Sequence, residues 1–232
     1  MDPLARRPPT DLAYEGTIEG LVMAHPQLFI RQRKEWVEIV VDFETANRYE
    51  VLAPDQSSLG MVAERAGGFM DTIKRWLLRS HRPFDIDVTD PAGRTLLHLT
   101  RDFFWFFSDL DVVRPDGTRL GSVHRRFGIL SKKYDLIGPD GQLFARIKSP
   151  FYRLWAFPVY GDDGQERGRI AKKWGGALRE VFSDADSYMI DYSQHEWSAA
   201  ERATLFAAAV SIDFDFFENN QGSGGLLDML GD

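Results

Sequence analysis

The chain has 232 residues, 44% of them hydrophobic, and a formal net charge of −7 at pH 7. This length and composition are enough for a single domain with one sizeable core. The acidic balance argues against nucleic acid as the main partner, because phosphate binding favours an excess of lysine and arginine. Cysteine is absent, which excludes disulfides, thiolate nucleophiles, cysteine metal sites and cysteine-linked lipids.

The two ends of the chain differ in composition from its middle. Arg6 and Arg7 are followed by prolines rather than by an apolar run, which is typical of neither a signal peptide nor a myristoylation site. We expect a disordered lead over residues 1–15, one domain over 16–218 and a disordered tail over 219–232. The expected location is the cytoplasm or, peripherally, the cytosolic face of a membrane, with no secretion and no transmembrane helix.

The first third of the chain predicts three strands and a helix. The strands are expected at residues 28–32, 36–41 and 49–52, and the helix at 67–79, where apolar residues recur with the helical period. The other face of this helix is basic, with Lys74, Arg75 and Arg79. Two interpretations stay open: a helix lying on an acidic membrane surface, or a helix that closes one end of the fold.

The middle of the chain repeats a hairpin unit about every 24 residues. The four predicted turns end at Gly93, Gly117, Gly141 and Gly164, each preceded by an aspartate within three residues. Glycine supplies the positive φ that tight hairpin turns need. Four evenly spaced hairpins predict a mainly β fold in which an antiparallel sheet closes as a barrel or a sandwich.

A basic cluster follows the second strand of most hairpins. Its members are Arg125, Arg126, Lys148, Lys172 and Lys173. If these residues emerge at one rim, they would form a positive patch for anionic lipid headgroups. The alternative is that charges at strand ends protect sheet edges from aggregation. Acidic turns at the opposite ends of the hairpins would in either case give the fold a charge polarity.

An aromatic run interrupts the hairpin region. It consists of Phe103, Phe104, Trp105, Phe106 and Phe107. Neighbouring residues on a strand face opposite sides, so five successive rings cannot all face one core. The run predicts a membrane or partner patch if it is exposed, and otherwise a strand buried on both faces or a loop covering one end of the fold.

The last element is predicted to be a helix over residues 198–218. Ser198 and Glu201 have the spacing of a capping box. The apolar stretch that follows has about ten residues, whereas a membrane span needs about 20. A helix that is apolar on nearly all sides but too short to span a bilayer belongs in a core. We therefore predict a closed antiparallel β-barrel filled by its own hydrophobic C-terminal helix.

The sequence contains no catalytic constellation that we can identify. It has no nucleophile elbow, no zinc-protease motif and no phosphate-binding loop, and its five histidines are scattered. Asp213 and Asp215 are expected to be structural, because both lie at the end of the predicted core helix, where the chain can reach solvent. An acid inside a barrel must be paired or hydrogen-bonded, and Arg or Lys from the strands could pair with it. Acid–base chemistry by this pair is the alternative. We expect a protein that is not an enzyme and holds no organic cofactor.

Ordered along the chain, six segments resemble the phospholipid scramblase family. They are residues 28–32, 43–51, 82–86, 168–174, 182–186 and 212–218, and together they extend over roughly residues 20–218. The family is similar to the tubby C-terminal domain. The resemblance therefore implies a barrel of about twelve strands around a central hydrophobic helix.

The resemblance also implies a function and a cation. It implies Ca²⁺-stimulated, ATP-independent, bidirectional movement of phospholipids between membrane leaflets. The Ca²⁺ segment corresponds to residues 184–195, where Asp184 and Asp186 fit the first two ligand positions of a calcium loop and Asp191 is an additional acid. Met189 and His195 replace the glycine and the bidentate acid of such a loop, so binding is expected to be in the mM range or absent. A turn leading into a strand is the alternative.

The chain departs from the family at its lipid attachment site. Where vertebrate members carry a cysteine cluster, this sequence has the aromatic run, whose insertion into lipid could replace the missing acyl chains. The expected partner is a phospholipid membrane surface, with oligomers, deep insertion or bilayer distortion needed for transport. The alternative function is a soluble tubby-like lipid-binding or scaffold module that docks peripherally on anionic membranes without scrambling.

Overall fold

The computed structural model describes residues 16–33, 48–64, 84–101, 108–126, 131–150, 156–172 and 187–216. Its helices are α1 (Ile18–Met23) and α4 (Ala199–Phe216). Its strands are β1 (Gln27–Arg33), β2 (Arg48–Leu52), β3 (Ser58–Glu64), β4 (Phe84–Thr89), β5 (Thr95–Arg101), β6 (Ser108–Val113), β7 (Arg119–Arg126), β8 (Ser131–Ile137), β9 (Leu143–Pro150), β10 (Ala156–Tyr160), β11 (Glu166–Ala171) and β12 (Ser187–Asp191).

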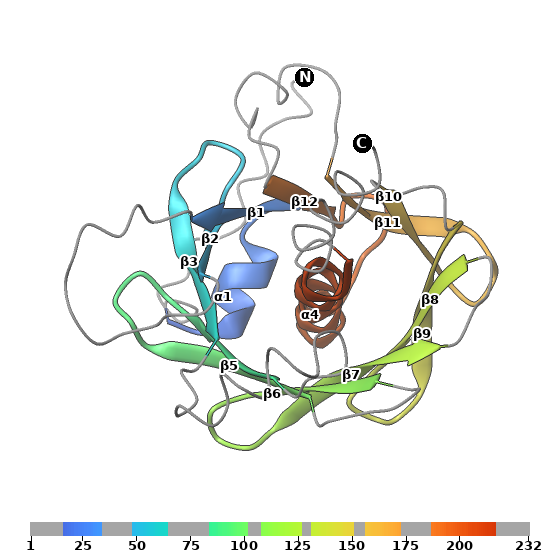
Figure 1. The fold of residues 1–232 in the computed structure, drawn as a ribbon, viewed down its shortest axis with the longest axis horizontal. Coiled ribbons are helices and arrows are strands. Elements are labelled where there is room, and N and C mark those ends of the chain that lie inside the picture. Colours follow the sequence, from blue (N-terminus) through green and yellow to red (C-terminus); the bar gives the residue numbers. More distant parts are fainter. Residues whose placement is uncertain are drawn as a thin grey trace, which may run out of the picture.

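The twelve strands of the described residues form one closed antiparallel barrel. Each strand pairs with its neighbours in the chain, and β1 closes the sheet by pairing with both β2 and β12. Figure 1 shows α4 inside the barrel, with α1 beside it. The mainly β class, the closed barrel and the central C-terminal helix predicted from the sequence are all confirmed.

The four predicted hairpin turns join β4 to β5, β6 to β7, β8 to β9 and β10 to β11. Gly93, Gly117, Gly141 and Gly164 have φ of 81°, 87°, 77° and 76°. In each turn the carboxylate of an aspartate accepts a hydrogen bond from the backbone N–H two residues later, as Asp116 does from Thr118 at 2.8 Å. The acid of the repeat therefore stabilises the turn, and the hairpin predictions are confirmed.

A fifth turn of the same kind joins β2 to β3, and the sequence did not predict it. Gln56, with φ of 69°, takes the position that glycine holds in the other four turns. Asp55 accepts a hydrogen bond from Ser57 N–H at 2.9 Å, as the other turn acids do. Without the glycine signal, β3 was missed. The expected strand at 36–41 and the helix at 67–79 lie outside the described residues.

All five hairpin turns lie at one end of the barrel, which we call the turn end. The connections at the other end span residues 34–47, 65–83, 102–107, 127–130, 151–155 and 173–186, all of which lie outside the described residues. We call this second end the far end. Odd-numbered strands end there and even-numbered strands begin there.

Helix α4 begins at the turn end with the predicted capping box. Ser198 N–H donates to Glu201 Oε2 at 2.8 Å, and Glu201 N–H donates to Ser198 Oγ at 3.3 Å. Every residue from Ala203 to Asp213 is buried, as expected of a core helix. Among the described residues, no helix is long and apolar enough to cross a bilayer.

Two contacts fix α4 inside the barrel. Arg202 donates to the carbonyl oxygens of Val22 and His25 at 3.1 and 3.0 Å, which ties α4 to the end of α1. Strand β7 also lies against α4: a Cβ at Gly121 would lie 2.3 Å from Thr204 Oγ1 of α4 and 2.4 Å from the carbonyl oxygen of Ile137 on the neighbouring strand β8. Glycine is required at this position because the Thr204 side chain and the β8 backbone leave no room for a Cβ.

Gly121→Ala is therefore expected to destabilise the fold by about 1–3 kcal/mol through overpacking. The change should appear as a lower urea midpoint, measured by circular dichroism. The double variant Gly121→Ala/Thr204→Ala should recover part of the loss, because it removes one of the two colliding groups. A midpoint equal to that of the wild type would contradict the close packing of α4 against β7.

Candidate functional site

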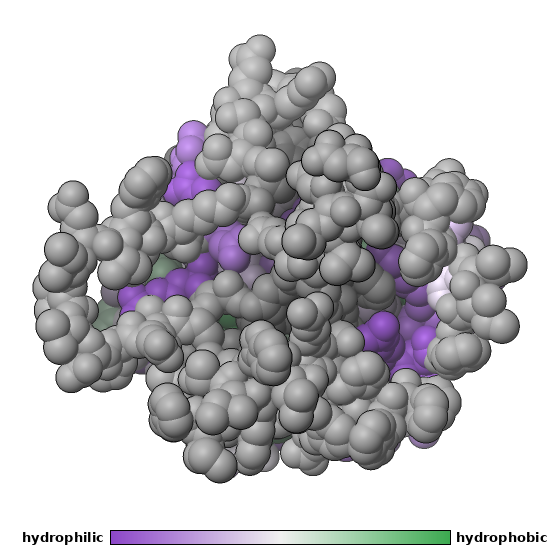
Figure 2. All heavy atoms as spheres, in the orientation of Figure 1, coloured by the Kyte–Doolittle hydropathy of each residue, from purple (hydrophilic) through white to green (hydrophobic). Residues whose placement is uncertain are grey.

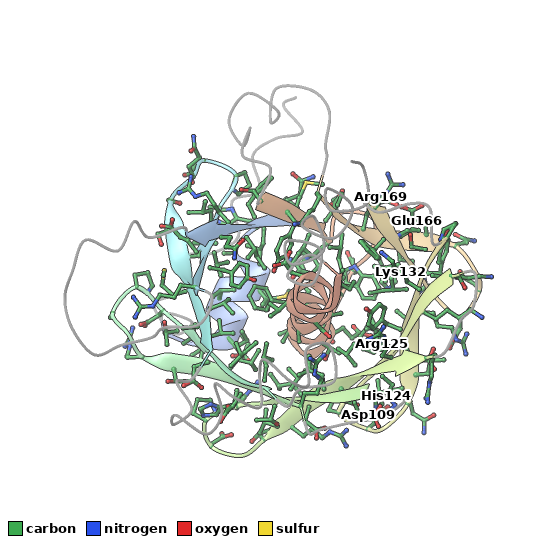
Figure 3. The ribbon with its side chains drawn as sticks, in the orientation of Figure 1. Asp109, His124, Arg125, Lys132, Glu166 and Arg169 are labelled. Atoms are coloured by element: carbon green, nitrogen blue, oxygen red, sulfur yellow. The ribbon has the colours of Figure 1, made fainter. Side chains whose placement is uncertain are left out.

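Basic side chains gather inside the barrel at its far end. Residues alternate between the two faces of a strand, so Arg125 shares the inner face of β7 with buried Val123, and Lys132 shares that of β8 with buried Tyr134. Arg101 ends β5 in the same way and is buried. Figure 3 shows Arg125 and Lys132 on the inner side of the wall.

Like Arg101, Lys132 is buried in this cluster. Its residue is 6% exposed, and its Nζ lies 5.2 Å from the centre of the Phe157 ring. Burial, together with the nearby charge of Arg125, lowers the pKa of Lys132 from 10.5 to about 8. The far end therefore holds like charges close enough to disfavour each other, in a partly desolvated environment.

A buried ion pair joins the barrel wall to the central helix. Lys172, directly after β11, lies 3.3 Å from Asp213 of α4, and both side chains are only 9% exposed. The phenol of Tyr188 on β12 is also buried, and burial together with the charge of Asp213 holds the pKa of Tyr188 well above its usual value of 10. The expected pairing of Asp213 with a strand cation is confirmed, while the side chain of Asp215 is not described.

A small cavity lies between these groups. It is lined by Phe157, Ile170, Lys172, Tyr188, Ala209, Ile212 and Asp213, and its volume is about 10 Å³. This is about the room that one water molecule needs. It is too small for a lipid headgroup or an acyl chain.

The outer wall carries further charges, many of them in ion pairs. Asp109 on β6 is paired across the sheet with His124 on β7, and Glu166 forms an ion pair with Arg169 at 2.6 Å (Figure 3). Arg126 points outward and binds Asp135 at 2.8 Å. In Figure 2, hydrophilic residues are visible on both the left and the right of the view, and those on the right lie where Figure 1 places β8 and β9.

The basic residues that the sequence singled out therefore divide between two faces. Arg125 and Lys172 face the interior, and Lys172 is occupied by Asp213. Arg126 and Lys148 face outward and are exposed. The sequence suggested that these cations could emerge at one rim. They do lie toward the same end of the barrel, the far end, opposite the acidic turns, but they do not share one face of the sheet.

Most other predicted site residues lie outside the described residues. These are Lys74, Arg75, Arg79, Phe103, Phe104, Trp105, Phe106, Phe107, Lys173, Asp184 and Asp186. Asp191 is described at the end of β12, where its carboxylate accepts a hydrogen bond from Ser193 N–H at 2.9 Å. Within the described ranges, no three acidic or histidine side chains are grouped to hold a metal ion.

Sequence reasoning missed Lys132, although its signal is visible in the strand pattern. Lys132, Tyr134 and Leu136 alternate with more polar or exposed neighbours, and all three are buried. A lysine in phase with the apolar residues of a strand indicates an inward-facing cation. Two adjacent lysines resemble an ordinary solvated strand end, which obscures the alternation.

Comparison with known protein families identifies the family to which this chain belongs. The model of the family described as Scramblase matches residues 11–219 of the chain. The chain belongs to the Scramblase family. The match covers the whole barrel and α4, and it agrees with the resemblance carried by the six sequence segments.

Relatives of this Scramblase family member are found in fungi and mammals. It is 25% identical to Altered inheritance rate of mitochondria protein 25 of Saccharomyces cerevisiae, over 92% of this chain and 77% of the relative. It is 25% identical to a phospholipid scramblase family protein of Schizosaccharomyces pombe, over 88% and 63%. It is 28% identical to phospholipid scramblase 2 of Bos taurus, over 84% and 70%. The chain thus spans about two thirds to three quarters of these relatives.

A solved structure of a protein from Arabidopsis thaliana is also similar to this Scramblase family member. The two share 14% identity, with a TM-score of 0.47 over 81% of this chain and 91% of the other.

Removing one partner of the Lys172–Asp213 pair leaves a buried charge uncompensated, which typically costs 3–5 kcal/mol. Asp213→Ala should therefore lower the free energy of unfolding by about 3 kcal/mol, measured by urea denaturation. The double variant Lys172→Met/Asp213→Leu, which removes both charges, should recover most of that loss. If the single and double variants were equally destabilised, the charge of Lys172 would not be the cause.

The lowered pKa of Lys132 predicts that the free energy of unfolding rises with pH. Between about pH 8, its pKa in the fold, and 10.5, its ordinary value, the folded state releases a proton that the unfolded state keeps. Unfolding then takes up a proton, so the free energy of unfolding increases with pH in this window. Urea denaturation of wild type and Lys132→Met from pH 7 to 10 should show the wild type gaining stability relative to the variant. Parallel curves would contradict a depressed pKa for Lys132.

Proposed function

We propose that this protein acts on phospholipids at a membrane surface and promotes their ATP-independent, bidirectional movement between the two leaflets. The observation that carries this proposal is the Scramblase family match over residues 11–219, together with relatives named phospholipid scramblase. The exposed basic residues of the outer wall support contact with anionic headgroups.

The closed, filled barrel limits how such movement can occur. The described interior is packed around α4, and its cavity of about 10 Å³ admits no headgroup. We therefore propose that lipids move at the outer surface of the protein, by distortion of the bilayer next to it. The hydrocarbon that a headgroup must cross is about 30 Å thick, so local thinning would lower the barrier without a pore through the barrel.

A second candidate function is peripheral docking without transport. The specific observation that favours it is that α4, the longer of the two described helices, is buried in the core of the barrel, and no described helix is long and apolar enough to cross a bilayer. In this case the protein would be a lipid-binding or scaffold module at anionic membranes.

Ca²⁺ enters the proposal only as a weak stimulant. Asp191 is partly engaged by the backbone of Ser193, and the sequence around Asp184 and Asp186 lacks the glycine and the bidentate acid of a calcium loop. We expect no response to micromolar Ca²⁺ and a response only in the millimolar range, if Ca²⁺ binds this segment.

A reconstitution experiment tests the function. Liposomes containing a fluorescent phospholipid in both leaflets, with and without the purified protein, are treated with dithionite, which quenches only the outer leaflet. Scrambling exposes inner-leaflet lipid, so quenching should continue beyond the outer-leaflet share in EDTA and, at least as strongly, in millimolar Ca²⁺.

Two outcomes would decide against scrambling. Quenching that stops at the outer-leaflet share under all conditions, with the protein shown by flotation to be bound to the liposomes, would leave peripheral docking. Heat-inactivated protein is the matched control, and equal quenching by it would indicate leakage of dithionite rather than lipid movement.

A further inference from the structure

Four cations lie in one row across the outer wall of the barrel. Arg126 on β7 is paired in register with Lys133 on β8, and Lys133 is paired with Lys148 on β9. The register of β9 and β10 places Pro158 opposite Lys148, and Pro158 is paired with Arg169 on β11. All four charged residues are exposed. We call Arg126, Lys133, Lys148 and Arg169 the outer basic row.

The middle of this row is not neutralised by the described residues. Arg126 binds Asp135, and Arg169 binds Glu166. Lys133 and Lys148 face each other directly, and no residue in the described part of the chain forms an ion pair with either. Like charges directly opposite each other on a sheet are destabilising, so the pair costs stability unless an outside anion offsets it.

Protection of a sheet edge does not explain these lysines. Charges on edge strands prevent aggregation because an edge has unpaired backbone groups. Strands β8 and β9 are paired on both sides within a closed barrel and have no edge. Protection of sheet edges, the usual explanation for basic strand ends, therefore does not account for the outer basic row.

Charge is unevenly distributed around the barrel. The outer face of β4 and β6 carries Asp85, Asp87, Asp109 and Asp111, of which Asp87 contacts His98 and Asp111 pairs with Arg119. The turn end carries the acids that stabilise the hairpins, and the whole chain has a net charge of −7. An anionic surface would be repelled by the acidic parts of the molecule and attract the outer basic row, which would favour one orientation.

We infer that the outer basic row is the surface by which this protein docks on an anionic phospholipid membrane, with β7, β8 and β9 toward the lipid. Adjacent strands are about 4.8 Å apart, so the row extends over about 19 Å, which matches an array of headgroups rather than a single ion. The choice of a lipid surface rests on the proposed function, and the geometry of the row does not.

Co-sedimentation with vesicles tests this inference. Full-length protein is mixed with vesicles of phosphatidylcholine alone or with added phosphatidylserine, at low and at physiological salt. Each lysine near an anionic surface contributes about fivefold to the partition coefficient, so Lys133→Gln/Lys148→Gln should weaken binding to the anionic vesicles by about thirtyfold. Lys133→Arg/Lys148→Arg keeps the charge and should retain binding.

The chain offers a control matched in net charge. Gln142 and Gln165 are exposed in two turns at the turn end, and Gln142→Glu/Gln165→Glu also lowers the net charge by two. Because these sites lie away from the row and charges are screened within about 8 Å at physiological salt, binding should change by less than about threefold. Equal urea midpoints for both double variants would show that each is folded.

Several outcomes would overturn the inference. Equal losses in both double variants would assign binding to net charge rather than to the row, and absence of wild-type binding to anionic vesicles would remove the surface altogether. If single-stranded RNA displaced the protein from anionic vesicles as effectively as an excess of unlabelled vesicles does, a nucleic acid would be favoured as the partner of the row.

The inference and the proposed function can fail separately. Binding that depends on the row, without lipid scrambling, would leave the docking surface and remove the transport activity. Scrambling that persists at the wild-type rate in Lys133→Gln/Lys148→Gln would keep the activity and place docking elsewhere on the protein.

Discussion

The burial of α4 inside the barrel is the constraint on which the rest of the structure depends. A sheet of twelve strands has an inner face that must be covered, and residues 203–213 of α4 are buried on all sides to cover it. Hydrophobic burial drives this arrangement, and small residues make it fit: alanines dominate the helix, and Gly121 lets β7 approach Thr204. The ties made by Arg202 to the end of α1 then fix the helix at the turn end.

The same constraint determines where charge can lie. The apolar helix fills the middle of the barrel, so inward-facing cations are found near the far end, where Lys172 binds Asp213 and Lys132 has a depressed pKa. On the outside, closure of the sheet leaves no edge to protect, and charges there are free to form ion pairs or to meet another surface. The charges available to the proposed lipid partner are therefore outside, while those inside stabilise or strain the fold.

Much of this architecture could be predicted because it is encoded locally. Glycine after aspartate marks four turns, and Ser198 with Glu201 marks the start of the core helix. The turn at Gln56 could not be predicted in this way, because Gln adopts a positive φ that usually requires glycine. The site was harder still: Arg125 and Arg126 are neighbours in sequence but face opposite sides of β7, and only the barrel reveals which side is inside. The outer basic row depends on the register of several strands, which no single segment encodes.

The filled barrel has to be reconciled with the lipid movement that the family's name suggests. Moving a lipid headgroup through a protein requires a polar path, but the cavity beside Lys172 and Tyr188 has room for about one water molecule. Moving it next to a protein requires only that the bilayer be deformed, and deformation requires attachment at a defined orientation. A net charge of −7 with a local row of cations provides orientation without strong overall attraction. The outer wall, rather than the interior, is consequently where mutation can separate the proposed lipid binding from the proposed transport.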